Sequence, residues 1–349
     1  MAPLVGCSSR SRVTVGHRLS AMAALASDGG PHGVPVRASA LWKRFGALDV
    51  VRDVSLEIAQ GEVVGFVGPN GAGKSTTIRM MLDIFAPDRG TVEVFGAPID
   101  DAARRRIGYL PEERGLYPGL RIPPILKYMA ELKGVPTQEA PGLADAALER
   151  LGLTEHRPKK VGELSRGLRQ LLQFAATIQH KPDFLVLDEP FSGLDPVNVR
   201  LMKNTVAELR DDGVAVLFST HQMTDVEELC DRVVMINRGE IVLNGGVREI
   251  RRQHASDRLL VECASDLPYA LSLPGVATVE SHGDGWRISL DDDGSAEGVL
   301  RSLLDAGVQI ERFEREAPTL EEIFLQIVGG ADGSANGNGT PDEGARPGG

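Results

Sequence analysis

Short apolar runs of strand length recur along the chain, and longer stretches with helical spacing separate them. We expect strands at residues 63–67, 91–94, 184–187, 214–219 and 232–237. The spacing of apolar residues predicts helices at 74–84 and 198–211. Strands that alternate with helices in this way are typical of an α/β fold.

A mostly helical stretch from residue 101 to about 182 interrupts this alternation. It predicts a helical subdomain inserted into a first domain that spans residues 35–250. A second unit begins near Asp257, where short apolar runs and helix-like segments predict a small α+β domain over 257–328. We expect its strands at 258–263, 276–281, 286–290 and 309–314, and a closing helix at 319–327 that shares the separate core of this unit.

The two ends of the chain differ from the rest in composition. Residues 1–34 are rich in Ser, Arg, Gly and Ala, and residues 329–349 are dominated by Gly, Asn, Asp and Pro. Such segments bury too little apolar surface to offset the entropy lost on ordering. We expect both ends to be disordered.

Composition and charge narrow the class of protein. The 349 residues suffice for about two domains, and 42% hydrophobic with 25% charged residues is close to the globular average. The net charge of -11 comes from the C-terminal part, since residues 261–349 carry -12 and the rest +1. No cluster of Lys and Arg stands out, so we expect no nucleic acid partner.

Cysteines and apolar runs indicate the compartment. Cys7, Cys230 and Cys263 are widely spaced and form no CxxC pair, which is typical of a reducing compartment and gives no metal site. The apolar runs fall far short of the roughly 20 residues that span a bilayer. We expect a cytoplasmic chain whose membrane role, if any, comes through a partner.

A glycine-rich motif directly follows the strand expected at 63–67. Its residues match the pattern GxxxxGK[ST] and are Gly68, Pro69, Asn70, Gly71, Ala72, Gly73, Lys74 and Ser75, followed by Thr76. The backbone N–H groups of such a loop wrap phosphates, and the next helix adds positive potential at its N-terminus. We expect Lys74 to reach the β- and γ-phosphates and Ser75 to give an oxygen to Mg²⁺.

Two adjacent carboxylates end the strand expected at 184–187. In an extended chain Asp188 and Glu189 point to opposite sides, which suits two different roles. Asp188 is expected to hold Mg²⁺, while Glu189 orients or deprotonates the attacking water. The alternative without a catalytic role is a strand end that carries two solvated carboxylates. The phosphate motif earlier in the chain favours the catalytic interpretation.

Further motifs follow in a fixed order, and with them residues 41 to about 247 resemble the ATP-binding subunits of ABC transporters. Ser165 and Gly167 lie in Leu164-Ser165-Arg166-Gly167-Leu168, which is similar to the signature of that family. Asp195 ends Ser192-Gly193-Leu194-Asp195, which is similar to the family's D-loop. His221 resembles the switch histidine, and Phe45 stands where the family stacks an aromatic ring on adenine.

The resemblance implies a P-loop NTPase core of the ABC ATPase type that uses ATP and Mg²⁺. It also implies two nucleotide-binding domains packed head to tail, so that Ser165 and the Gly167 backbone of one close on the γ-phosphate held by the other. This sequence contains one set of motifs. We therefore expect a second ATPase subunit, either a copy of this chain or a sister subunit, and catalytic roles for Glu189 and His221.

Three positions depart from the family pattern. Glu112 stands where most of the family has the glutamine of the Q-loop, so a carboxylate replaces an amide. In the signature, Arg166 replaces a glycine and Leu168 replaces a glutamine. Glu112 can still offer oxygen to Mg²⁺ or water, but it adds a negative charge and loses the amide donors.

The segment at 108–118 and the added C-terminal unit resemble the sodium- and drug-efflux branch of ABC exporters. This implies an ATP-binding and ATP-hydrolysing subunit that dimerises on MgATP, drives a separately encoded transmembrane permease and lies on the inner face of the cell membrane. Residues 112–135 are expected to face the permease. A regulatory or soluble ABC ATPase with low intrinsic turnover stays open as the alternative because of Glu112.

Overall fold

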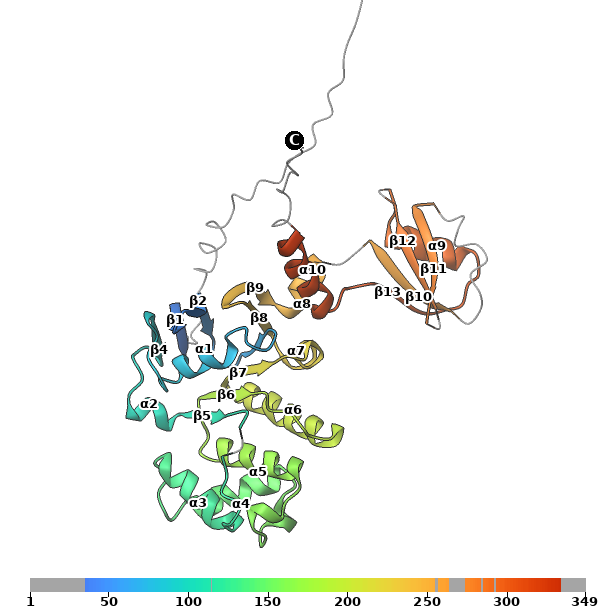
Figure 1. Cartoon of the computed structure of the whole chain (residues 1–349). Helices are drawn as coiled ribbons and strands as arrows, with labels where there is room; N and C mark the ends of the chain where they lie inside the picture. The colour runs from blue at the N-terminus through green and yellow to red at the C-terminus, as the bar shows by residue number, and fades with distance from the viewer. Residues whose placement is uncertain are drawn as a thin grey trace, which may run out of the picture. The chain divides into compact units, whose positions relative to one another are not determined.

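The computed structural model describes residues 35–113, 115–254, 257–263, 274–283, 285–291 and 293–333 (Figure 1). The N-terminal segment 1–34 and the last residues, 334–349, for which we expect disorder, lie outside these ranges. Within them, three sheets and the helices around them account for the fold.

The main sheet has six strands and carries the strongest of the expected runs. Its order is β5 (Ile107–Leu110), β6 (Phe184–Asp188), β7 (Ala215–Thr220), β3 (Val63–Val67), β8 (Arg232–Asn237) and β9 (Glu240–Gly246). The first five are parallel, and β9 is antiparallel to β8. Every residue of β3, β6 and β7 is buried, which explains why these strands read as continuous apolar runs.

Helices follow the strands of this sheet as the α/β pattern predicts. They are α1 (Lys74–Met81), α6 (Pro196–Asp211), α7 (Met223–Leu229) and α8 (Val247–Gln253). The helix expected at 74–84 ends early, because Asp83 takes a left-handed φ of 53° and leaves the helix. The helix expected at 198–211 begins two residues earlier, at Pro196, where Asp195 caps it.

A second, antiparallel sheet was largely absent from the sequence-based expectation. It consists of β2 (Leu48–Ile58), β1 (Val36–Phe45) and β4 (Arg89–Val94) in that order. The expected strand at 91–94 exists, but it pairs antiparallel with β1 and is no part of the α/β alternation. Its apolar face packs with α1 and one face of the main sheet in a single core cluster.

The inserted helices are α3 (Ile122–Leu132), α4 (Ala140–Arg150) and α5 (Arg166–Ile178), which pack together (Figure 1). A short helix, α2 (Asp101–Arg105), precedes β5. Because β5 pairs with β6 in the main sheet, the helical insertion begins after Leu110, later than the expected residue 101. A four-residue strand gives too short a pattern to separate it from its helical surroundings.

The C-terminal sheet has the order β11 (Val276–His282), β12 (Gly285–Leu290), β10 (Arg258–Cys263) and β13 (Ile310–Arg315), all antiparallel. These strands match the expected ones to within a residue. Helix α9 (Ala296–Asp305) supplies Val299 and Leu303 to a small core with Leu259, Val261, Ile288 and Leu290.

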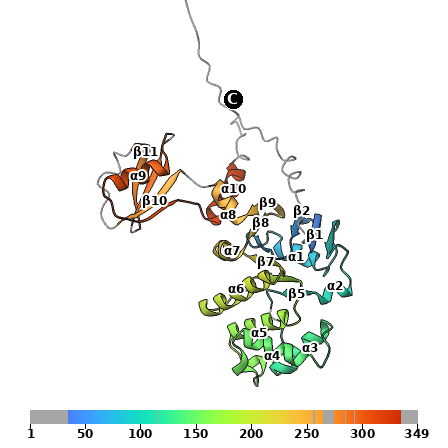
Figure 2. The same cartoon turned by 180° about the vertical axis from the view of Figure 1, so that it is seen from behind.

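The closing helix, α10 (Leu320–Gly333), belongs elsewhere, and its expected place in that small core was wrong. Leu320 and Ile323 are fully buried in the larger core of the first unit, where α10 contacts α7 and α8 (Figures 1 and 2). The backbone N–H of Leu320 donates to Glu227 Oε1 of α7 at 2.6 Å. Arg251 of α8 donates to the Pro318 carbonyl at 3.2 Å. The helix also continues past residue 328, where we expected order to end.

Candidate nucleotide site

The glycine-rich loop joins β3 to α1 and is held tightly by its neighbours. Gly73 has a φ of 107°, and a Cβ at this position would lie 2.8 Å from the Val50 carbonyl oxygen. A Cβ at Gly68 would lie 2.1 Å from the carbonyl oxygen of Ile236. Only glycine fits at these two positions, and the resulting loop leaves its backbone N–H groups beside the N-terminus of α1.

Lys74 is buried inside this loop. Its Nζ donates to the Gly68 carbonyl at 2.6 Å and to the Pro69 carbonyl at 3.3 Å. Burial lowers the pKa of Lys74, and the charges of Glu189, Asp188 and Glu112 partly offset this effect. The ammonium group therefore rests on two neutral carbonyls, and a phosphate can offer it a stronger, charged partner.

Asp188 ends β6 next to β7. It is 2% exposed, and the hydroxyl of Ser219 on β7 donates to its Oδ1. This hydroxyl, which the sequence-based reasoning missed, fixes the orientation of a carboxylate that is aimed at the loop cavity. Ser75 lines the same cavity as Asp188, and a hydroxyl and a carboxylate are oxygen ligands of the kind that Mg²⁺ uses.

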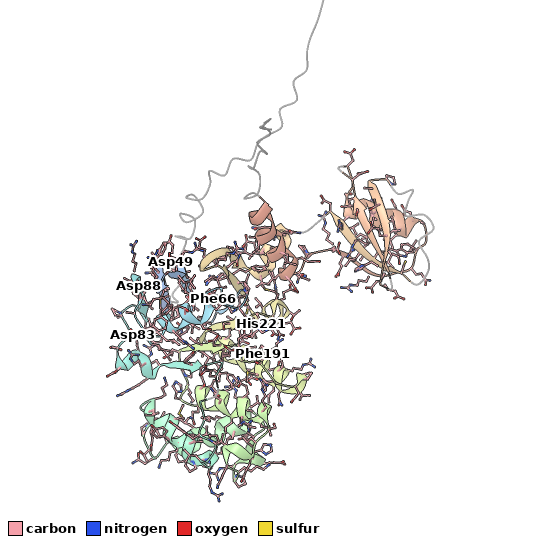
Figure 3. All side chains as sticks on the ribbon, viewed as in Figure 1. Asp49, Phe66, Asp83, Asp88, Phe191 and His221 are labelled. Carbon is pink, nitrogen blue, oxygen red and sulfur yellow. The ribbon has the colours of Figure 1, made fainter. Side chains whose placement is uncertain are left out.

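Glu189 does not continue the strand, and the expectation of opposite-facing carboxylates was wrong. Its φ of 48° turns the chain out of β6, so both carboxylates line the same cavity. His221, which follows β7, places its Nδ1 3.0 Å from each carboxylate oxygen of Glu189. His221 and Phe191, both labelled in Figure 3, line a second pocket together with Glu189.

A cavity of about 360 Å³ brings these groups together. The expected site residues that line it are Asn70, Gly71, Gly73, Lys74, Ser75, Thr76, Glu112, Asp188, Glu189 and His221. Gly68, Pro69 and Ala72 complete the loop without lining the cavity. Two lining residues were not expected, Val50 and Ser192. Val50 carries no chemistry that a sequence pattern could reveal, and Ser192 lay within the D-loop motif.

Glu112 adds a third carboxylate to this cavity. Its side chain is exposed and lines the cavity with Asp188 and Glu189. Three carboxylates thus face one lysine and one histidine. An occupant with several phosphates needs a divalent cation to offset this negative charge.

The remaining expected residues lie outside the cavity of this single chain. Phe45 is 51% exposed, and its ring meets Phe85 edge-on with centroids 6.0 Å apart. Ser165 caps α5 by accepting from the Leu168 N–H at 3.2 Å, and Gly167 follows in its first turn. Asp195 caps α6, and its hydrogen bonds with Asn198 and Val197 hold the pKa of its carboxyl below the usual range.

Comparison with known proteins identifies two families along the chain. Residues 51–192 match the family model described as ABC transporter, and residues 245–328 match the C-terminal domain described as ATP-binding protein DrrA1-3-like. The second match includes α8, the small sheet and α10 as far as residue 328. It therefore spans the helix–helix contact that joins α10 to the first unit.

Relatives and solved structures agree with these matches. The uncharacterized ABC transporter ATP-binding protein YhaQ of Bacillus subtilis is 39% identical over 82% of this chain and 96% of its own length. The daunorubicin resistance ATP-binding protein DrrA3 of Streptomyces coeruleorubidus is 32% identical over 82% of this chain and 93% of its own. A solved ATP-binding subunit of an ABC transporter is 28% identical, with a TM-score of 0.59, over 63% of this chain and 93% of that one.

The family resemblance and the fold class expected from the sequence are thereby confirmed. The first unit has the P-loop NTPase fold of ABC ATPases, and a small antiparallel sheet with helix α9 packed on it follows in the chain. Among the helices of the described ranges, none has the length and apolar character needed to cross a bilayer.

Proposed function

Since the chain belongs to the ATP-binding proteins of ABC transporters and carries their DrrA-like C-terminal domain, we propose that it binds and hydrolyses MgATP to power an exporter. The observation that carries this proposal is the single cavity in which the phosphate loop, Lys74, Asp188 and the Glu189–His221 pair meet. ABC ATPases as a family bind ATP. What we propose for this chain is its turnover, its metal, its partners and its cargo.

The phosphate loop binds the triphosphate. Its backbone N–H groups and the N-terminus of α1 supply positive potential, and Lys74 moves its Nζ from the loop carbonyls to the β- and γ-phosphate oxygens. Phe45 offers an exposed ring on which adenine stacks. The edge-on ring of Phe85 supports Phe45 from the side.

The residues around the cavity fit Mg²⁺. Ser75 and Asp188 would hold the ion, with Ser219 fixing the carboxylate of Asp188. Bound there, Mg²⁺ neutralises phosphate charge and orients the terminal phosphate for attack. Glu112, which lines the same cavity, could offer a further oxygen to the ion or to a water.

Glu189 is the catalytic carboxylate in this proposal. It accepts a proton from the attacking water, whose oxygen bonds to the γ-phosphorus while the bond to the β,γ-bridging oxygen breaks. The products are ADP and inorganic phosphate. His221 fixes the Glu189 carboxylate through Nδ1 and leaves its other ring nitrogen to face the γ-phosphate.

The partners follow from what lies outside the cavity. Ser165, Gly167 and Asp195 do not reach the chain's own phosphate loop, so a second copy of the chain that binds head to tail would receive them. A separately encoded permease would dock on residues 112–135, which include the exposed Tyr117 and Tyr128. The complex would lie on the inner face of the membrane, with a drug-like cargo, as the daunorubicin-resistance relative suggests.

Two variants test the proposal. Glu189→Gln should keep MgATP affinity, lose at least about 100-fold in turnover, and form a dimer in MgATP that size-exclusion chromatography detects. Lys74→Ala should weaken nucleotide binding itself, measured by calorimetry. A Glu189→Gln protein that hydrolyses ATP at the parental rate and stays monomeric contradicts the catalytic assignment.

The regulatory alternative rests on Glu112 in the acidic cavity. It predicts tight MgATP binding with negligible turnover, both for the free chain and in complex with the permease. Turnover that rises when the permease is added excludes it.

A further inference from the structure

Two side chains of α5 hold the segment that follows Glu189. Gln170, 2% exposed, donates from Nε2 to the Pro190 carbonyl at 3.1 Å. The Arg166 guanidinium fills the space that a side chain at Gly193 would need, because a Cβ there would lie 2.6 Å from Nε and 2.9 Å from Cζ. Arg166 and Gln170 are four residues apart and share one face of the helix. Helix α5 thus contacts the segment 189–195 near its first residues, at Pro190, and in its middle, at Gly193.

The segment from Glu189 to Asp195 is a compact series of turns. The Ser192 N–H donates to the Glu189 carbonyl at 3.3 Å, and the Leu194 N–H donates to the Phe191 carbonyl at 3.1 Å. The Phe191 ring packs on Phe218 with centroids 5.2 Å apart. Movement at Gly193 is therefore passed along these turns to Glu189.

Helix α5 is a stiff body with a functional N-terminus. Its residues from Gln170 to Ile178 are all buried, and Ser165 caps its first turn. Ser165 and Gly167 are the residues that the proposed dimer presents to the nucleotide of the second copy. A force on this N-terminus moves the helix as a unit, because its buried length cannot bend independently.

We propose that Arg166 and Gln170 are positioning residues for Glu189, which tie the phosphate-contacting end of α5 to the segment that carries the catalytic carboxylate. When the nucleotide of the second copy binds at Ser165 and Gly167, the shift of α5 pulls Gly193 and Pro190 with it and sets the Glu189 carboxylate. This inference rests on the proposed ATP hydrolysis. It assigns a role to Arg166, which stands where the family's signature has glycine.

The contact between Arg166 and Gly193 joins a charged side chain to backbone. Within the described ranges no carboxylate forms an ion pair with Arg166. A guanidinium suits this contact better than a lysine ammonium, because its rigid group of three nitrogens and a carbon fills more space than one compact ammonium. The contact also requires glycine at 193, whose φ of 75° and missing Cβ leave the space.

The test compares steady-state hydrolysis by the full chain and its variants in saturating and limiting MgATP. Arg166→Ala should lower kcat about tenfold, as expected when a catalytic group is displaced, and change the Kd for MgATP less than twofold. Arg166→Lys should recover part of kcat. Arg200→Ala, which removes an exposed arginine from α6, is the matched control and should match the parent.

A second substitution asks whether Arg166 acts through residue 193. Gly193→Ala displaces the guanidinium and should lower kcat in the same way. If the contact carries the effect, the double variant Arg166→Ala/Gly193→Ala is no slower than the slower single variant. If instead the fold-losses of kcat in the two single variants multiply in the double variant, the two residues act independently and the inference is overturned.

Hydrogen exchange gives a readout that does not depend on turnover. Arg166→Ala should speed exchange of the Ser192 and Leu194 amides about fivefold or more, while the amides of β3 stay protected. Parental exchange at Ser192 and Leu194, or a raised Kd for MgATP with parental kcat, overturns the inference. A parent that binds MgATP but hydrolyses none, with or without a permease, contradicts the proposed function, and the exchange result still decides the contact.

Discussion

The position of α10 predicts that substitutions in it affect the stability of the first unit and not that of the small C-terminal core. Ile323 is fully buried among residues of the first unit, whereas Leu303 of α9 is buried in the small C-terminal core. Ile323→Ala should therefore destabilise the nucleotide-binding unit, although the residue follows the small sheet in sequence. Leu303→Ala removes a similar volume from the other core and is the matched control.

The expected size follows from burial. Truncating a fully buried Ile or Leu to Ala costs about 2–5 kcal/mol, the transfer free energy plus that of the cavity left behind. A loss of about 3 kcal/mol lowers the midpoint of a unit of this size by about 6–12 °C. Ile323 lies near the hydrogen bond from Leu320 to Glu227, so loosening α10 also weakens that charge-assisted contact.

Calorimetric unfolding with and without MgATP is the assay. A ligand raises the midpoint of the unit that binds it, so MgATP marks the transition of the first unit. Ile323→Ala should lower this marked transition, and Leu303→Ala should leave it in place. If Ile323→Ala leaves the marked transition at the parental midpoint, α10 does not stabilise the nucleotide-binding unit and our placement of its packing energy is wrong.

Three further substitutions test separate features. Glu112→Gln removes one negative charge from the cavity, so calorimetry without Mg²⁺ should show a severalfold lower Kd for ATP. An unchanged Kd would place Glu112 away from the phosphates. Burial lowers the pKa of His180 from 6.5 to about 4. Between pH 6.5 and pH 4 only the unfolded chain takes up a proton at this residue, so the free energy of unfolding falls as the pH falls. Urea unfolding should show a loss of about 2 kcal/mol from pH 7 to pH 5, which His180→Gln abolishes; an equal loss in that variant would assign the dependence to other groups. A cysteine at the exposed Tyr117 should crosslink to a co-expressed permease, and one at the exposed Leu304 of α9 should not. The reverse result would put the docking face on the C-terminal unit.

The strands that the sequence predicted best are those buried on both faces. In β3, β6 and β8 nearly every side chain is apolar, so the run itself marks the strand. In β1 the alternation is broken, because Ala40 takes a left-handed φ of 50° and the register with β2 shifts at bulges. A strand whose buried positions do not keep a period of two leaves no simple pattern to read.

The site was predictable where its residues are contiguous in sequence. The phosphate loop is one motif, and Asp188 and Glu189 are adjacent in sequence at the point where β6 ends. The turn at Glu189 was not predictable, because a left-handed glutamate is held by its surroundings and has no sequence signal. The docking of α10 was also hidden, since an amphipathic helix shows which face is apolar but not which core receives it.

Ser219 shows how a residue without any motif can orient a proposed metal ligand. It lies on β7 opposite Asp188 in the parallel register, is fully buried, and donates its hydroxyl to the Asp188 carboxylate. Removing a group that orients a metal ligand typically lowers metal affinity about 10- to 100-fold. Ser219→Ala should therefore raise the Mg²⁺ concentration at which nucleotide binding is half-maximal, while ATP affinity without metal stays at the parental value. Ser192→Ala, which removes an exposed hydroxyl from the same cavity, is the control and should leave the Mg²⁺ dependence unchanged. If both variants bind Mg²⁺ like the parent, Asp188 is held by the strand alone and the hydroxyl of Ser219 serves only its own burial.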